Sequence, residues 1–126
     1  MKLQESGEMY LEAILVTSQI KGSVRSIDIS EYLGYSKPSV SRAMHLLIDA
    51  GYINMDEGGS ITLTPSGKDI AEKIYERHRV ISKLLMLLGV DEKTATDDAC
   101  KIEHDLSDVS FEAIKKHIQW EHQIEV

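Results

Sequence analysis

The sequence is poor in several features, and each shortage excludes a class of protein. It contains a single cysteine, Cys100, so an internal disulfide is impossible and a disulfide-stapled secreted domain is excluded. No apolar run approaches the length needed to span a bilayer, and residues 1–7 lack the apolar segment of a signal peptide. We therefore expect a cytoplasmic protein that makes no contact with a membrane.

Positive charge is also scarce. The chain has 14 Lys and Arg residues against 21 Asp and Glu residues, and its formal net charge is −7 at pH 7. An acidic surface repels a phosphate backbone, which argues against indiscriminate binding to nucleic acid. If the protein binds DNA, the positive charge that it uses must be local. Its 126 residues suffice for one compact core, or for two small lobes that share a helix.

The N-terminal half has the pattern of a helix-turn-helix. Apolar residues recur at helical spacing over residues 5–20, which predicts a first helix. A short second helix is predicted from Ser26, as its N-cap, to a stop at Gly34, and a third from the N-cap Ser36 to Gly51. Two short helices joined by a tight, glycine-containing turn form this motif.

The third helix has one apolar and one polar face. Its inward stripe is predicted to consist of Val40, Ala43, Met44 and Leu47. The residues left for the outer face and the N-terminal turn are of types that contact phosphates and base edges. They are the predicted DNA-binding residues Lys37, Ser39, Ser41 and Arg42, together with His45.

A hairpin follows the third helix. Residues 52–55 and 60–63 are strand-like, and the Asp56-Glu57-Gly58-Gly59 segment between them is a turn signal. Three helices and a hairpin in this order predict a winged helix-turn-helix. The tip of this wing is acidic, so we expect it to bind the DNA phosphates only weakly.

The C-terminal half is predicted to be helical. A linker helix over residues 64–88 has Thr64 as N-cap and Pro65 in its first turn, a second helix runs from Asp91 to about Ser107, and a third follows Ser110. We therefore predict a mainly α protein with a winged-helix DNA-binding domain at 1–72 and a helical domain at 73–126. The last two helices are expected to expose an apolar surface that a second subunit buries, giving a homodimer.

One stretch of the C-terminal half carries metal-binding residue types. Cys100, Glu103 and His104 fall at i, i+3 and i+4, so on a helix they project from one face. A thiolate, a carboxylate and an imidazole together can bind a divalent transition metal. Further ligands must come from elsewhere, and the thioether, carboxylate and imidazole available are those of Met9, Glu12 and His78. Thiolate and thioether ligands favour Fe(II), Co(II), Ni(II) or Zn(II) over Mn(II), which prefers oxygen. Of these we expect Fe(II), with Mn(II) close behind.

Several motifs, spread over nearly all of the chain, are those of a known family. They are Glu8-Met9-Tyr10-Leu11-Glu12, Ser36-Lys37-Pro38-Ser39-Val40-Ser41, Leu63-Thr64-Pro65-Ser66-Gly67, Arg77-His78-Arg79, Leu88-Gly89-Val90-Asp91 and Cys100-Lys101-Ile102-Glu103-His104-Asp105-Leu106-Ser107. With them the chain resembles the metal-dependent repressors typified by the diphtheria toxin repressor and the manganese transport regulator.

The resemblance implies a function and a set of ligands. In the iron-sensing branch the primary site corresponds here to Met9, Cys100, Glu103 and His104, and all four residue types match. Glu12, His78, Glu103 and His104 match ligands of the manganese branch, so one or two ions per subunit are implied. The chain would then be a homodimeric transcriptional repressor that binds a palindromic DNA operator when Fe(II) or Mn(II) is abundant.

One other function fits parts of the sequence, and a second is not supported by it. A winged-helix regulator could respond to an organic ligand, or to oxidation of the Cys100 thiol, without any metal. A metalloenzyme is not expected, because the chain has no His-Glu-x-x-His motif and no evident acid or base beside an open coordination position.

Overall fold

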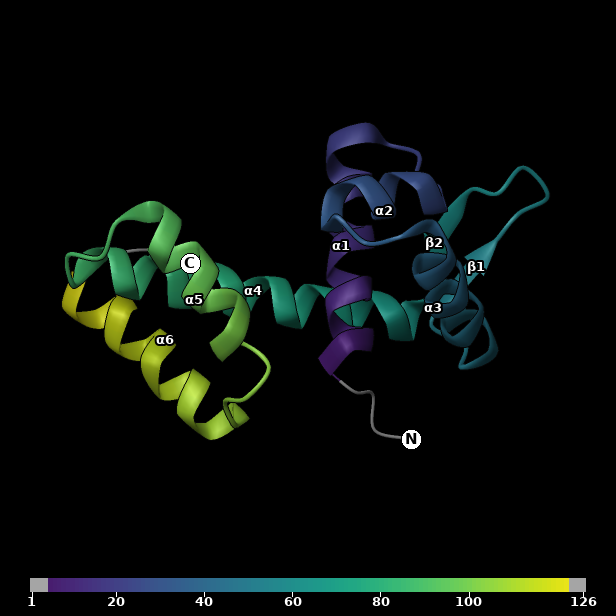
Figure 1. Cartoon of the computed structure of the whole chain (residues 1–126). Helices are drawn as coiled ribbons and strands as arrows, with labels where there is room; N and C mark the ends of the chain where they lie inside the picture. Colours follow the sequence, from purple (N-terminus) through teal and green to yellow (C-terminus); the bar gives the residue numbers. More distant parts are fainter. Residues whose placement is uncertain (1–4, 123–126) are drawn as a thin grey trace. The chain divides into compact units, whose positions relative to one another are not determined.

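The structure is a computed structural model that describes residues 5–122, with side chains described as far as residue 119. It is mainly α-helical with one two-stranded antiparallel sheet (Figure 1). In chain order its elements are α1 (Glu5–Lys21), α2 (Ser26–Leu33), α3 (Lys37–Asp49), β1 (Ile53–Met55), β2 (Ile61–Leu63), α4 (Pro65–Leu87), α5 (Glu92–Ile102) and α6 (Asp108–His122). The predicted fold class is confirmed: an N-terminal winged helix-turn-helix precedes a helical C-terminal part.

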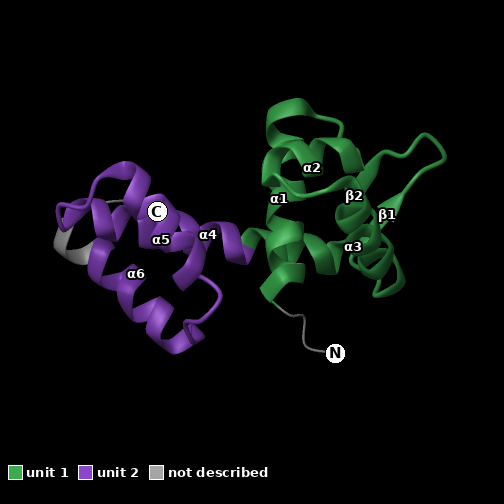
Figure 2. Cartoon of the chain, viewed as in Figure 1, with its two compact units in different colours: residues 1–72 green, residues 73–126 purple. Residues whose placement is uncertain are grey.

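The chain forms two compact units, residues 1–72 and residues 73–126, and α4 runs from one into the other (Figure 2). None of the helices in the described part of the chain is long and apolar enough to cross a membrane.

The first unit is built around a core shared by its helices and its hairpin. Leu11 and Ile14 of α1 are fully buried, as are Ile29 of α2 and Met44 of α3. Their burial withdraws apolar surface from water, which is the main favourable term in folding. Three residues of the inward stripe predicted for α3, namely Val40, Met44 and Leu47, are buried, and the fourth, Ala43, is half-buried.

The caps of the two short helices differ. Ser36 is the N-cap of α3, and its hydroxyl oxygen accepts a hydrogen bond from the Ser39 backbone N–H at 3.3 Å. The predicted cap of α2 is wrong by one residue, because Ser26 is already helical and Arg25 is the N-cap. The Arg25 N–H donates to the Asp28 carboxylate at 2.9 Å, so a carboxylate in the first turn replaces the serine hydroxyl that was expected to cap.

The hairpin pairs Ile53 with Leu63 and Met55 with Ile61. Its turn is closed by Asp56, whose carboxylate accepts from the Ser60 N–H at 2.8 Å. Gly59 takes φ = +84°, which a residue with a side chain rarely adopts. The hairpin is fastened to the helices through the Ile61 N–H, which donates to the Val24 carbonyl at 2.7 Å.

The second unit packs α4 against α6. Val80 of α4 and Phe111 and Ile118 of α6 form a buried cluster, and Leu84 and Ile114 cover it. On α5, the small residues Ala95 and Ala99 are fully buried.

The ends of α5 and α6 differ from the prediction. The helix expected to continue to about Ser107 ends at Ile102, with Glu103 as its C-cap. The cap of α6 is Ser107 rather than Ser110, since the Ser107 hydroxyl oxygen accepts from the Ser110 N–H at 3.2 Å. The early end of α5 has a tertiary cause. The buried Arg77 guanidinium donates hydrogen bonds to the carbonyl groups of Glu103 and Leu106, which in a continuing helix would accept from backbone N–H groups.

Candidate metal centre

Three potential metal ligands converge in the second unit. His78 comes from α4, Cys100 from α5 and Glu103 from the cap of α5, and one donor atom of each lies within 4.8 Å of the other two. His78 Nδ1 is 2.9 Å from Glu103 Oε2 and 3.7 Å from Cys100 Sγ. Cys100 and Glu103 are brought together by one turn of helix, whereas His78 is 22 residues before Cys100 in the chain.

Glu103 is the centre of this cluster. Its side chain is only 1% exposed, and its second carboxylate oxygen, Oε1, lies 3.4 Å from Nε2 of His104, which is itself 4% exposed. The buried carboxylate therefore lies between two imidazoles. A buried negative charge requires a positive partner, because its desolvation is otherwise strongly unfavourable.

His78 can provide that positive partner, because its Nδ1 lies 2.9 Å from Glu103 Oε2. Hydrogen bonds to Cys100 and Glu103 raise the pKa of His78 to about 10, so its imidazole carries a proton at neutral pH. A divalent cation would supply the same compensation with a larger charge, and its ligands would be a neutral imidazole, a thiolate and a carboxylate. The donor set and the buried carboxylate thus fit a divalent transition metal.

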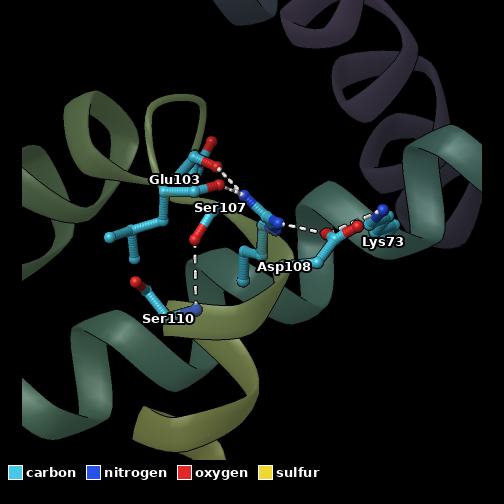
Figure 3. A network of polar contacts seen from close by, with 7 residues as sticks. Lys73, Glu103, Ser107, Asp108 and Ser110 are labelled. Atoms are coloured by element: carbon cyan, nitrogen blue, oxygen red, sulfur yellow. Dashed lines mark hydrogen bonds and ion pairs between the residues drawn. The ribbon is translucent and has the colours of Figure 1, made fainter.

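The segment that carries Glu103 is held by Arg77 of α4. The Arg77 side chain is 6% exposed; its guanidinium donates to the carbonyls of Glu103 at 3.1 Å and Leu106 at 2.5 Å. It also donates to the Asp108 carboxylate at 2.6 Å and lies 5.2 Å from the centre of the Phe111 ring. Lys73 binds the same Asp108 oxygen at 2.9 Å, and Figure 3 shows Glu103, Asp108 and Lys73 in this network.

Arg77 was not predicted as a site residue. The sequence presents it only as one basic residue beside His78, and nothing local shows that its side chain is buried. The available signal was its spacing: Arg77 lies three residues after Ile74 and four before Ile81, so it shares their apolar helix face.

The remaining predicted ligands, Met9 and Glu12, lie on α1 in the first unit. Both side chains are partly exposed. The Met9 sulfur accepts a hydrogen bond from the Tyr35 hydroxyl at 3.5 Å, and the Tyr35 ring meets the Tyr10 ring edge to face with centroids 6.1 Å apart. The structure thus brings together His78, Cys100 and Glu103, and His104 lies beside the second oxygen of Glu103. That Met9 and Glu12 bind the same metal is part of the proposal below.

The predicted DNA-binding residues lie on α3. Lys37, Ser41 and Arg42 are exposed, and Ser39 is half-buried because its hydroxyl belongs to the cap, where it accepts from the Ser36 hydroxyl at 2.9 Å. Both acidic residues of the wing tip, Asp56 and Glu57, are exposed.

Comparison with known proteins places this architecture in a family. Residues 2–59 match the N-terminal DNA-binding domain of iron-dependent repressors, and residues 64–123 match the metal-binding and dimerisation domain of the same family.

Individual relatives agree with these matches. The uncharacterized HTH-type transcriptional regulator MJ0568 of Methanocaldococcus jannaschii is 36% identical over 115 residues, which are 90% of this chain and 92% of that protein. The HTH-type transcriptional regulator MntR of Bacillus pumilus is 34% identical over 91% of this chain and 80% of its own length.

A solved structure shares the same fold over a longer chain. The structure of the manganese regulator SloR superposes with a TM-score of 0.80 at 27% identity and covers 95% of this chain. The present chain spans only about half of that protein, 55% of its length. Since both domain matches follow one another in order along the chain, it belongs to the iron-dependent repressor family of metal-dependent transcriptional repressors.

Proposed function

We propose that this chain represses transcription by binding a palindromic DNA operator as a homodimer when Fe(II) or Mn(II) is bound beside Cys100. The observation that carries the proposal is the convergence of His78, Cys100 and Glu103 within 4.8 Å of one another, around a carboxylate that is almost fully buried. The thiolate favours Fe(II), and the similarity to the manganese regulator SloR keeps Mn(II) as the other candidate.

The proposed ligands are Met9, Glu12, His78, Cys100, Glu103 and His104, which together can hold one or two ions per subunit. A bound divalent ion supplies a positive charge that ligands from different helices can share. Met9 and Glu12 belong to α1, so ligation by them would link the first unit to the second. Such a link biases the protein toward one arrangement of its two units.

The two units have different roles in this proposal. Residues 1–72 bind DNA through Lys37, Ser39, Ser41 and Arg42, residues 73–126 bind metal and dimerise, and residues 64–88 connect them. The large exposed apolar residues of the second unit suit a surface that a second copy covers. Met86, Leu87 and Leu88 lie at or directly after the end of α4 and Val109 lies on α6, whereas the sequence predicts this surface on the last two helices. Two copies related by two-fold symmetry would present their α3 helices to two half-sites at one spacing.

The free energy required of the metal is modest. To turn operator occupancy from mostly off to mostly on, metal must favour the DNA-binding arrangement by roughly 3 to 5 kcal/mol. Several metal–ligand bonds can supply that difference.

The experiment is to measure operator binding with Fe(II), Mn(II), Zn(II) and a chelator, for the wild type and for Cys100→Ala. We expect Cys100→Ala to lower metal affinity by at least about tenfold, because one charged ligand is lost. The fold should be retained because Cys100 is exposed. Lys101→Ala is the matched control, since Lys101 is the exposed neighbour of Cys100 and no proposed ligand.

A second variant separates the two units. Arg42→Ala should weaken DNA binding and leave metal affinity unchanged, because Arg42 is on α3 in the other unit. Metal activation that persists in Cys100→Ala would remove Cys100 from the site. Operator binding that ignores chelator but disappears on thiol oxidation would instead support the regulator that senses oxidation through Cys100.

A further inference from the structure

The outer face of α3 carries a groove that extends beyond the proposed DNA-binding residues. Ser41, Arg42, His45 and Leu46 line it, and its volume is about 420 Å³. Ser41 and Arg42 already belong to the proposed DNA interface, whereas His45 and Leu46 lie up to one further turn along the same helix. Residues three and four positions apart share a helix face, so all four can face one DNA groove.

The hydrogen bonding of His45 fixes what its imidazole can recognise. The ring is exposed, and Nδ1 lies 2.8 Å from the backbone carbonyl oxygen of Ser41. A carbonyl oxygen can only accept, so Nδ1 must be the donor and must carry the proton. In the neutral ring Nε2 then has a free lone pair and acts as an acceptor. The bond to the helix backbone also restricts the ring before any ligand arrives, which lowers the entropy lost on binding.

Leu46 adds an apolar contact beside this acceptor. Its side chain is 70% exposed, and it is the only large hydrophobic residue of α3 with a strongly exposed side chain. The buried stripe of the same helix, Val40, Met44 and Leu47, is turned to the core, so Leu46 has no part in that packing.

One base pair presents the complement of an acceptor next to an apolar group. In the major groove an A·T pair offers the N6 amino group of adenine as donor and the 5-methyl group of thymine. A G·C pair offers an amino group on cytosine but no methyl group. We infer that His45 and Leu46 together read an A·T base pair, with Nε2 accepting from adenine N6 and Leu46 covering the thymine methyl group. The inference rests on the proposed function, in which α3 enters the major groove.

The test begins with a library of duplexes that carry a randomised central segment, selected by binding to the wild-type protein with Mn(II) as the probe metal. An A·T pair should be invariant at one position in each half-site. In the selected duplex, that adenine is then replaced by purine, which lacks the amino group, and separately that thymine is replaced by uracil, which lacks the methyl group.

The two replacements should each depend on one side chain. For the wild type, purine should weaken binding about fivefold, as expected for one lost hydrogen bond, and uracil about fourfold, as expected for one uncovered methyl group. The affinity of His45→Ala should be unchanged by purine and still be lowered by uracil. The affinity of Leu46→Ala should be unchanged by uracil and still be lowered by purine. Asp49→Ala, at an exposed position of α3 that does not line the groove, is the control and should behave as the wild type.

Several results would overturn the inference. One is a selected site without an invariant A·T pair. Others are a purine penalty that persists in His45→Ala, or an equal loss of affinity for all duplexes in that variant. These outcomes leave the proposed repressor function intact, because the wild type would still select a site. A library from which no sequence is enriched would overturn both.

Discussion

At the scale of single residues, the second unit is notable for two buried charged side chains, Arg77 and Glu103. Both are nearly inaccessible to water. The Glu103 carboxylate lies beside His78, and the Arg77 guanidinium donates to backbone carbonyl groups and to the Asp108 carboxylate. The two residues also meet, because Arg77 donates to the Glu103 backbone carbonyl while the Glu103 side chain faces His78. The position of a candidate ligand thus depends on a buried cation that contacts no ligand side chain in the described network.

The contribution of Arg77 can be measured by replacing it with methionine. Arg77→Met removes the donors that satisfy the Glu103 and Leu106 carbonyls, so we expect a loss of about 2 to 4 kcal/mol in the free energy of unfolding. Urea unfolding followed by circular dichroism checks this. Arg79→Met is the control: Arg79 is exposed and stacks on Tyr75 at 5.1 Å, so less than about 1 kcal/mol should be lost. Equal stability of the two variants would contradict a structural role for Arg77.

Asp108 should give the stability of the second unit a dependence on acid pH. Hydrogen bonds from Lys73 and then from Arg77 hold the pKa of Asp108 below its ordinary value. A carboxylate with a lowered folded pKa stabilises the fold above its unfolded pKa of about 3.9, and this stabilisation is lost as pH falls through the lower folded value. In Asp108→Asn that pH-dependent part should disappear.

The measurement is the free energy of unfolding of both proteins as a function of pH. The difference between wild type and Asp108→Asn should be constant above about pH 5 and shrink below about pH 4. A difference that stays constant through the acid range would show that the ion pair is formed equally in the unfolded chain.

At the scale of elements, the ends of helices are set by what they pack against. The start of α4 is an example: the Thr64 hydroxyl donates to the Gly51 carbonyl at 2.8 Å, and the Thr64 N–H donates to the Tyr52 carbonyl at 3.0 Å. This brings the first turn of α4 against the backbone that enters the hairpin. A Cβ atom on Gly67 would lie 2.0 Å from the Tyr52 carbonyl oxygen, so only glycine fits there.

Gly67→Ala is therefore expected to destabilise the first unit by about 2 kcal/mol or more, because two backbone segments would have to separate. Gly58→Ala is a matched control in the hairpin, where the nearest atoms to a new Cβ are side-chain atoms at 3.5 Å and 3.8 Å. Thermal unfolding of both variants compares the two sites. A Gly67→Ala protein as stable as Gly58→Ala would mean that α4 can shift without loss.

At the scale of the whole molecule, an acidic chain must bind DNA through a few local positive charges. In the proposed function these are the exposed Lys37 and Arg42 of α3, which would release counterions from the phosphate backbone although the net charge of the chain is −7. Salt should accordingly weaken operator binding with a shallow slope compared with that of a basic protein.

Lys37→Ala tests this charge distribution. A plot of the logarithm of the binding constant against the logarithm of salt concentration should become less steep by about 1, if Lys37 contacts one phosphate. Lys68→Ala is the control, since Lys68 is an exposed lysine of the first unit that lies on α4 and pairs with Glu72 at 3.8 Å. An equal change of slope in both variants would indicate a general charge effect rather than a contact by α3.

The order and type of the elements were determined by the sequence alone. Apolar periodicity, the N-cap Ser36 and the turn at Asp56–Gly59 are local signals, and they predicted the helices and the hairpin within a few residues. The spacing of Cys100 and Glu103 likewise predicted that one helical turn brings them together, as in the structure.

Only the tertiary structure decided where α5 ends, that Arg77 is buried, and that His78 lies within 3.7 Å of Cys100. It also decided that Gly67 must lack a side chain. The physical reason is the distance along the chain over which each interaction acts. Periodicity and capping act over a few residues, whereas these features depend on charges and backbone atoms that packing brings together from distant parts of the chain.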